Sequence, residues 1–168
     1  MERLAALKRA RGLDEVKLVL ITNATRLQDP EVVKGIDLLM ANGGEIWAKL
    51  DAGLEAPYRT FNRSAVPFDR ILENLAFAAA RWPLYIQTLF QEWEGQGPSE
   101  EELAAYVERI EALRASGKLL GLQVYTVARP TPESASRPLG AAALNALGES
   151  LRQRLPGLPI DLFHGPAA

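Results

Sequence analysis

The chain of 168 residues carries 19 basic and 21 acidic side chains, a formal net charge of -2, and 48% of its residues are hydrophobic. This composition is typical of a folded soluble domain, and it excludes a basic surface that would hold nucleic acid nonspecifically. The absence of cysteine excludes disulfides, thiolate zinc sites and iron–sulfur clusters held by cysteines of this chain.

The sequence shows no segment that would direct the chain to a membrane. No apolar run is long enough to span a bilayer, and the amino terminus lacks the uninterrupted apolar stretch of a secretory signal. We therefore expect a cytoplasmic protein with a single domain over residues 1–168. The one histidine, His164, lies near the end of the chain, where we expect an exposed side chain, and we predict no metal-ligating residues.

Short β-rich segments alternate with amphipathic helical segments along the chain. In chain order we predict helix 1–11, strand 17–22, helix 29–41, strand 45–50, helix 68–81, strand 84–89, helix 101–114, strand 122–127, helix 140–154 and a weaker strand 159–163. Two longer irregular segments remain, at 95–98 and 128–140.

The ends of two helices carry recognisable signals. Asp29 stands at the N-cap position of helix 29–41, with Pro30 at its first helical position. Ser99 and Glu102 have the spacing of a capping box at the start of helix 101–114. These signals support the predicted alternation of helices and strands.

Strands separated by helices of this length are joined by crossovers, so consecutive strands run parallel. Alternation within 45–51 places apolar side chains on one face and Trp47, Lys49 and Asp51 on the other. Gln87 and Tyr125 lie on the corresponding polar face of later strands. A doubly wound sheet would be apolar on both faces, whereas a polar face suits the interior of a barrel that holds a polar ligand. We predict an α/β fold: a partial parallel (β/α) barrel, or TIM-like half barrel, with about five strands alternating with helices.

Five strings, in this order and spacing, carry a resemblance to a known family. They are ITNAT at 21–25, AKLDAG at 48–53, YRTFNRS at 58–64, IQTLF at 86–90 and VYTVARP at 124–130. Together they resemble the later part of the radical S-adenosylmethionine (radical SAM) core, in particular the Fe–S oxidoreductases related to the wyosine-forming tRNA enzymes. The resemblance covers roughly 17–163, so the amino-terminal helical segment 1–14 lies outside it.

The family implies a partial barrel with a [4Fe–4S] cluster held by a CxxxCxxC loop after its first strand. A Gly-Gly-Glu-type motif after the second strand binds the amino group of the cofactor. The resemblance aligns 17–22 with the third strand of the family, so this chain lacks the unit that carries the cysteines. Gly43-Gly44-Glu45 precedes a strand instead of following one, and we interpret it as a helix-to-strand turn.

The resemblance also implies roles for residues at the strand ends. Its cofactor-binding positions are Asn23, Lys49, Asp51 and Gln87, and its substrate-binding positions are Asn62, Arg63, Tyr125 and Arg129. Three alternatives remain open. Lys49 and Asp51 are also explained by an ion pair that fills the barrel, Arg63 by a surface role on the loop after strand 45–50, and Arg129 by a turn beside a proline. Ala24 stands where the family has glycine.

The implied function is therefore a fragment or subunit of a radical SAM Fe–S oxidoreductase that is not catalytically competent alone. Its implied cofactor is S-adenosylmethionine; the [4Fe–4S] cluster expected for the family is not ligated by this chain. One alternative is a non-catalytic α/β binding or scaffold module that lost the cluster site. Another is an unrelated βα enzyme that uses Lys49 or Asp51 as an acid or base.

Loss of the first two units would leave strand 17–22 as an unpaired parallel edge rich in apolar residues. We expect this edge to be covered by a complementary N-terminal chain or by a second copy in a homo-oligomer. The amino-terminal helix 1–11 is a third candidate for that position.

Overall fold

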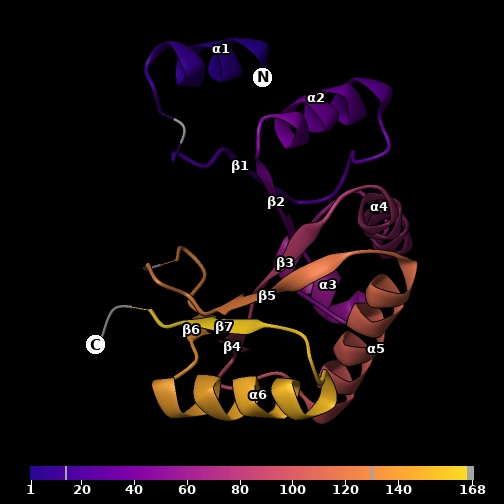
Figure 1. Ribbon diagram of the computed structural model, residues 1–168. Helices are drawn as coiled ribbons and strands as arrows, with labels where there is room; N and C mark the ends of the chain where they lie inside the picture. The colour runs from indigo at the N-terminus through magenta and orange to yellow at the C-terminus, as the bar shows by residue number, and fades with distance from the viewer. Residues whose placement is uncertain (14, 130, 166–168) are drawn as a thin grey trace.

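A computed structural model describes residues 1–13, 15–129 and 131–165 (Figure 1). Asp14 of the predicted amino-terminal segment and Pro130 of the VYTVARP string lie outside the described residues. The elements are α1 (Glu2–Ala10), β1 (Val19–Thr22), α2 (Pro30–Ala41), β2 (Glu45–Lys49), α3 (Glu55–Asn62), α4 (Phe68–Arg81), β3 (Leu84–Leu89), β4 (Gln91–Trp93), α5 (Glu100–Ser116), β5 (Leu119–Tyr125), β6 (Ser136–Pro138), α6 (Ala141–Arg154) and β7 (Ile160–Phe163).

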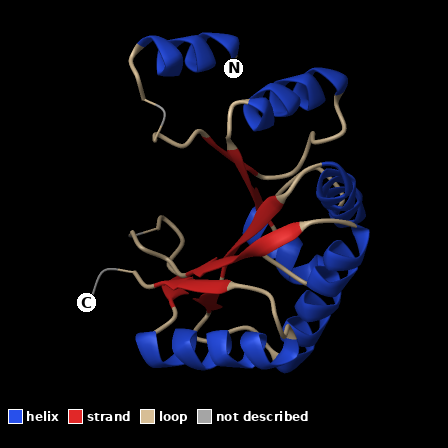
Figure 2. Cartoon of the chain, in the orientation of Figure 1, coloured by secondary structure: helices blue, strands red, loops and turns tan. Residues whose placement is uncertain are grey.

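All five predicted strands are confirmed, and they form one parallel sheet in the order β1-β2-β3-β5-β7. Helices connect successive strands, and α2, α4, α5 and α6 lie along one side of the curved sheet (Figures 1 and 2). The opposite, concave face carries no helix in the described chain (Figure 2). This is the predicted α/β partial parallel barrel.

Three elements were not predicted. Helix α3 occupies 55–62, and its only buried side chain is Tyr58, so it lacks the buried apolar stripe of helices such as α4 and α6. Strands β4 and β6 form a separate antiparallel ribbon in which Trp93 pairs with Ser136. The expectation that 128–140 is wholly irregular was therefore wrong, because β6 lies within it.

The two faces of the sheet differ as the alternation predicts. The outer face carries Ile46, Ile86 and Leu122, which are fully buried beneath the helices. Helix α4 contributes Leu75 and α5 contributes Ile110 to the same core, and both are fully buried. Because each fully buried aliphatic side chain stabilises the fold by about 1.5–3 kcal/mol, this face holds the sheet together.

The inner face is arranged in layers set by the strand register. One layer aligns Lys49, Gln87 and Gln123, since each of these residues lies opposite the next across β2, β3 and β5. A lower layer aligns Ile21 with Trp47. The inner face therefore carries a polar layer towards the carboxyl ends of the strands, and Ile21 and Trp47 form an apolar layer beneath it.

The helix-start predictions have mixed outcomes. Ser99 caps α5 as predicted, since its hydroxyl accepts a hydrogen bond from the backbone of Glu102 at 3.1 Å. Glu102 does not complete the capping box, because its carboxylate bonds elsewhere. Asp29 occupies the N-cap of α2 with no side-chain capping bond; its carboxylate pairs with Arg26 instead. None of the helices in the described part of the chain is long and apolar enough to cross a membrane.

Candidate functional site

A cavity of about 380 Å³ lies at the carboxyl ends of β2 and β3, where parallel α/β folds bind ligands. Four residues predicted for the site line it: Lys49, Asp51, Asn62 and Arg63. The loop after β5 and the β4–β6 ribbon provide the remaining wall. The structure therefore brings four of the eight residues predicted for the site to one cavity.

Asp51 is the centre of this cluster. Its side chain is buried, with a relative exposure of 8% for the residue. Oδ1 accepts a hydrogen bond from the backbone N–H of Leu89 at 2.9 Å, and Oδ2 accepts one from Nδ2 of Asn62 at 2.9 Å. Oδ2 also lies 3.3 Å from Nζ of Lys49. Asp51 therefore joins β2, β3 and α3 through a single carboxylate.

Lys49 projects from the end of β2 between two partners. Its Nζ donates to the hydroxyl of Tyr125 at 2.6 Å and pairs with Asp51. Nζ lies 5.4 Å from the ring centroid of Tyr125, beyond the hydroxyl, so the contact is a hydrogen bond rather than a cation–π interaction. Burial lowers the pKa of Lys49, but Asp51 and Tyr125 together outweigh it, and the pKa is raised. A protonated Lys49 suits the binding of an anion and is unsuited to act as a general base.

The side-chain amide of Asn62 has a hydrogen-bond partner for its nitrogen and none for its oxygen among the described residues. Its Nδ2 donates to Asp51, while Oδ1 is buried and has no hydrogen-bond partner among the described residues. A buried acceptor without a donor costs about 1–3 kcal/mol, so a ligand that brings an N–H or O–H group here gains affinity. Asn62 is the last residue of α3, which holds its side chain towards Asp51.

Arg63 follows α3 in the left-handed conformation, with φ of 46°. Its guanidinium donates to Oε1 of Glu133 at 2.8 Å, which joins the end of α3 to the loop before β6. This hydrogen bond is the main cause of a raised pKa for Arg63 and a lowered pKa for Glu133. Both groups are exposed enough that solvent screens the pair, so Arg63 can exchange Glu133 for an anionic ligand.

The other four predicted residues lie outside this cavity. Gln87 and Tyr125 line a neighbouring cavity of about 260 Å³ on the inner face, where Gln87 donates to Gln123 at 3.2 Å. Asn23 is exposed and accepts from the backbone and hydroxyl of Thr25, so it closes a local turn. Arg129 is exposed and does not line either cavity.

Sequence reasoning missed the aromatic part of the site. The rings of Phe61 and Trp93 lie 5.6 Å apart between centroids and form a wall of the cavity. Beside them, the hydroxyl of Ser136 donates to Gln91 at 2.7 Å across the ribbon. The alternation of Gln91 and Trp93, followed by the turn residues Glu94 and Gly95, was the available signal for a strand and its turn.

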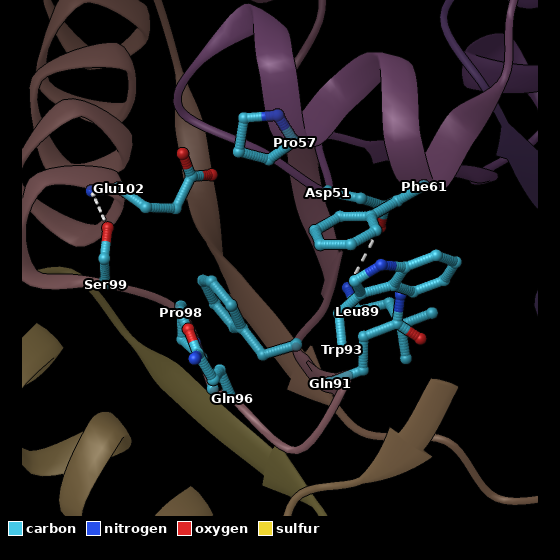
Figure 3. A pocket seen from close by; sticks show the side chains of 12 residues that line it. Asp51, Pro57, Phe61, Leu89, Gln91, Trp93, Gln96, Pro98, Ser99 and Glu102 are labelled. Carbon is cyan, nitrogen blue, oxygen red and sulfur yellow. Dashed lines mark hydrogen bonds between the residues drawn. The ribbon is translucent and has the colours of Figure 1, made fainter. Parts of the chain in front are cut away.

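A third cavity, of about 210 Å³, lies between α3 and the beginning of α5 and shares the Phe61 and Trp93 rings with the first (Figure 3). Glu102 of α5 lines it and is 5% exposed. Its Oε1 accepts from the backbone N–H of Gly53 at 2.6 Å, while Oε2 is buried without a partner among the described residues. Through Oε1, Glu102 therefore fastens the loop after β2 to α5.

Replacing Glu102 with glutamine is expected to raise the free energy of unfolding, relative to the parent chain, increasingly as the pH rises. Burial raises the pKa of Glu102, and the backbone N–H groups of Gly53 and Leu54 oppose the shift only in part. Folding thus favours the neutral carboxyl. Its contribution to the free energy of unfolding is fully present below the unfolded pKa near 4.5, and it is lost as the pH rises through the folded pKa. Glutamine does not titrate.

Urea unfolding of Glu102→Gln and the parent chain at about pH 4 and about pH 7 checks this expectation. Glu101→Gln is the matched control, because Glu101 is the adjacent residue and is exposed. A difference between Glu102→Gln and the parent chain that does not change with pH would contradict the assignment.

The residues of the site do not provide ligands for an iron–sulfur cluster. The chain has no cysteine, and its described residues contain no group of three or more histidines and carboxylates placed to hold a metal ion. By contrast, the donors and acceptors of Lys49, Asn62 and Arg63 fit a small molecule with amino and carboxylate groups.

No protein-family model matches this sequence, and no curated protein matches it. Among solved structures, the chain is similar to the crystal structure of a radical SAM methyltransferase from Sphaerobacter thermophilus. The TM-score is 0.60 and the sequence identity 12%, over 89% of this chain. The chain spans 40% of the length of that protein. The likeness shows a fold related to that of radical SAM enzymes.

Proposed function

We propose that this chain contributes the later barrel strands of a radical SAM-type oxidoreductase and binds S-adenosylmethionine at the carboxyl ends of β2 and β3. The observation that carries the proposal is the cluster of Lys49, Asp51 and Asn62, with its unsatisfied Oδ1, at the functional end of a partial barrel of related fold. In this proposal the chain is a fragment or subunit and is not competent alone.

The aminocarboxylate group of S-adenosylmethionine matches the polar groups of the cavity. Asn62 offers an acceptor to the amino group, and Lys49 and Arg63 offer positive charge to the carboxylate. On the inner face, Gln87 and Tyr125 add amide and hydroxyl groups beside the cavity. When bound, the cofactor supplies an activated sulfonium; its reductive cleavage needs an iron–sulfur cluster, for which this chain has no cysteine ligand.

Titration calorimetry with S-adenosylmethionine tests the binding proposal. The parent chain is expected to bind, and Lys49→Met is expected to bind at least about tenfold more weakly, because a charge-assisted hydrogen bond is lost. Lys34→Met is the matched control, since Lys34 is an exposed lysine of α2. Equal affinity of Lys49→Met and Lys34→Met would contradict the proposed site, as would no binding by the parent chain.

The partner in this proposal is a polypeptide that carries the missing βα units and covers β1. Val19 and Ile21 of β1 are 38% and 56% exposed, so α1 does not bury them. Exposed large apolar side chains are concentrated before residue 22, in a set that we call the amino-terminal apolar patch: Met1, Leu4, Leu7, Leu13, Val16, Val19 and Ile21. A patch of this kind beside an unpaired edge strand is typical of a surface that is covered by protein.

Sedimentation velocity of the isolated chain at micromolar concentration, alone and with a polypeptide bearing CxxxCxxC and Gly-Gly-Glu motifs, tests this partner. We expect a complex that Ile21→Lys disrupts and Phe163→Lys leaves intact, because Phe163 is similarly exposed but lies on β7 at the opposite edge. Self-association that Ile21→Lys disrupts would identify a homo-oligomer instead. A stable monomer that ignores the added polypeptide would contradict both.

The second candidate function is a non-catalytic α/β binding or scaffold module. The cysteine-free sequence favours it. Binding of S-adenosylmethionine without assembly into an iron–sulfur complex would support this module, and assembly with restored cluster absorbance would support the subunit.

A further inference from the structure

The cavity between α3 and the beginning of α5 has a composition that differs from the S-adenosylmethionine site proposed above. Three aromatic rings line it, those of Phe61, Phe90 and Trp93. Two acidic residues, Asp51 and Glu102, line it as well, and among the described residues no lysine, arginine or histidine does. Aromatic faces together with negative charge favour a positively charged ligand.

Only one of the two carboxylates has an oxygen without a hydrogen-bond partner among the described residues. Both oxygens of Asp51 already accept hydrogen bonds, from Leu89 and Asn62. Glu102 uses Oε1 for the backbone of Gly53, while its buried Oε2 has no partner among the described residues. In Figure 3 the carboxylate of Glu102 points away from α5 and towards Pro57 of α3, across the cavity from the Phe61 and Trp93 rings.

Contacts between aromatic rings set the positions of the three rings. Phe90 is 3% exposed and packs edge-on against Tyr106, with centroids 5.3 Å apart. Phe61 and Trp93 are inclined at 54° to each other, so they form a corner rather than a flat stack. Such a corner encloses a rounded cation better than it accommodates a planar ring.

We propose that this cavity binds a small alkylammonium group, with its alkyl carbons against Phe61, Phe90 and Trp93 and its positive charge facing Glu102. The volume of about 210 Å³ admits a methylated amine or the end of a lysine side chain. The ligand is a free amine or a lysine side chain of another protein; both present the same group. The inference does not depend on the proposed function.

Titration calorimetry at about pH 8 with tetramethylammonium and n-butylammonium tests this site, with tert-butanol as a neutral ligand of similar shape. We expect saturable binding of at least one cation and none of tert-butanol. Glu102→Gln is expected to weaken binding at least about tenfold, and Trp93→Leu likewise, whereas Glu101→Gln leaves it unchanged. A peptide with one trimethylated lysine, compared with the free cations, distinguishes the two sources.

Three results would overturn the proposal. They are no binding of either cation, equal binding of tert-butanol, and unchanged cation affinity in both Glu102→Gln and Trp93→Leu. The two variants alter opposite walls of the cavity, so failure of one to fold leaves the other as a test. Binding of S-adenosylmethionine provides a second readout, because it is expected at Lys49 and Asn62, which line the first cavity and do not line this one.

Discussion

Replacing Asp51 with alanine is expected to lower the free energy of unfolding by about 3 kcal/mol, because the change removes one partner of the mostly buried ion pair between Lys49 and Asp51. Lys49 would keep its charge with only Tyr125 beside it, and the backbone N–H of Leu89 would lose its acceptor. Asn62 would then have neither end satisfied. Asp51→Asn should cost less, since one acceptor for Leu89 remains while an N–H group faces Lys49.

Urea unfolding followed by circular dichroism measures these losses. Asp161→Ala is the matched control, because Asp161 continues the inner-face layer of Lys49 but is exposed on β7, and its replacement should change stability by less than about 0.5 kcal/mol. If Asp51→Ala and Asp161→Ala proved equally stable, Asp51 would not hold the strand ends together.

Replacing Gly53 with alanine is the second change with a large expected effect, a loss of about 3 kcal/mol. The loop after β2 lies so close to α5 that a Cβ atom at Gly53 would stand 2.6 Å from Cα of Tyr106 and 2.7 Å from the carbonyl carbon of Ala105. These are backbone atoms and cannot rotate away. The loop would have to move off α5, which would also break the hydrogen bond from Gly53 to Glu102.

Gly35→Ala provides the comparison. Gly35 lies within α2, and a Cβ atom there would meet nothing within 4 Å, so alanine should stabilise the chain by about 0.5–1 kcal/mol through helix propensity. Thermal unfolding of both variants should therefore shift in opposite directions. A Gly53→Ala variant as stable as the parent chain would show that the loop can retreat without cost.

Much of the fold could be predicted from local pattern. Period-two alternation placed Lys49 and Asp51 on one face and Ile46 on the other, and the buried and exposed faces of β2 match it. Because strands joined by helical crossovers are parallel, the same alternation also placed their functional ends on one side. Helix 68–81 was predicted with the bounds of α4, since its apolar stripe covers its whole length.

The remaining features depend on contacts between residues far apart in the sequence. The ribbon joins Gln91 to Ser136, and the pair over the cavity joins Arg63 to Glu133. Glu102 was correctly placed in the first turn of a helix, but its partner proved to be Gly53, on a different element. Local spacing cannot report such pairs, because it describes only neighbours along the chain.

The two faces of the sheet differ in how freely their residues can be substituted during evolution. Ile46, Ile86 and Leu122, which face the helices, are fully buried and leave little freedom for substitution. Their neighbours Trp47, Gln87 and Gln123 point to the concave side, where side chains bear less of the packing. Substitutions at alternate strand positions, on the concave side, can therefore change the ligand preference while the packing between sheet and helices stays intact.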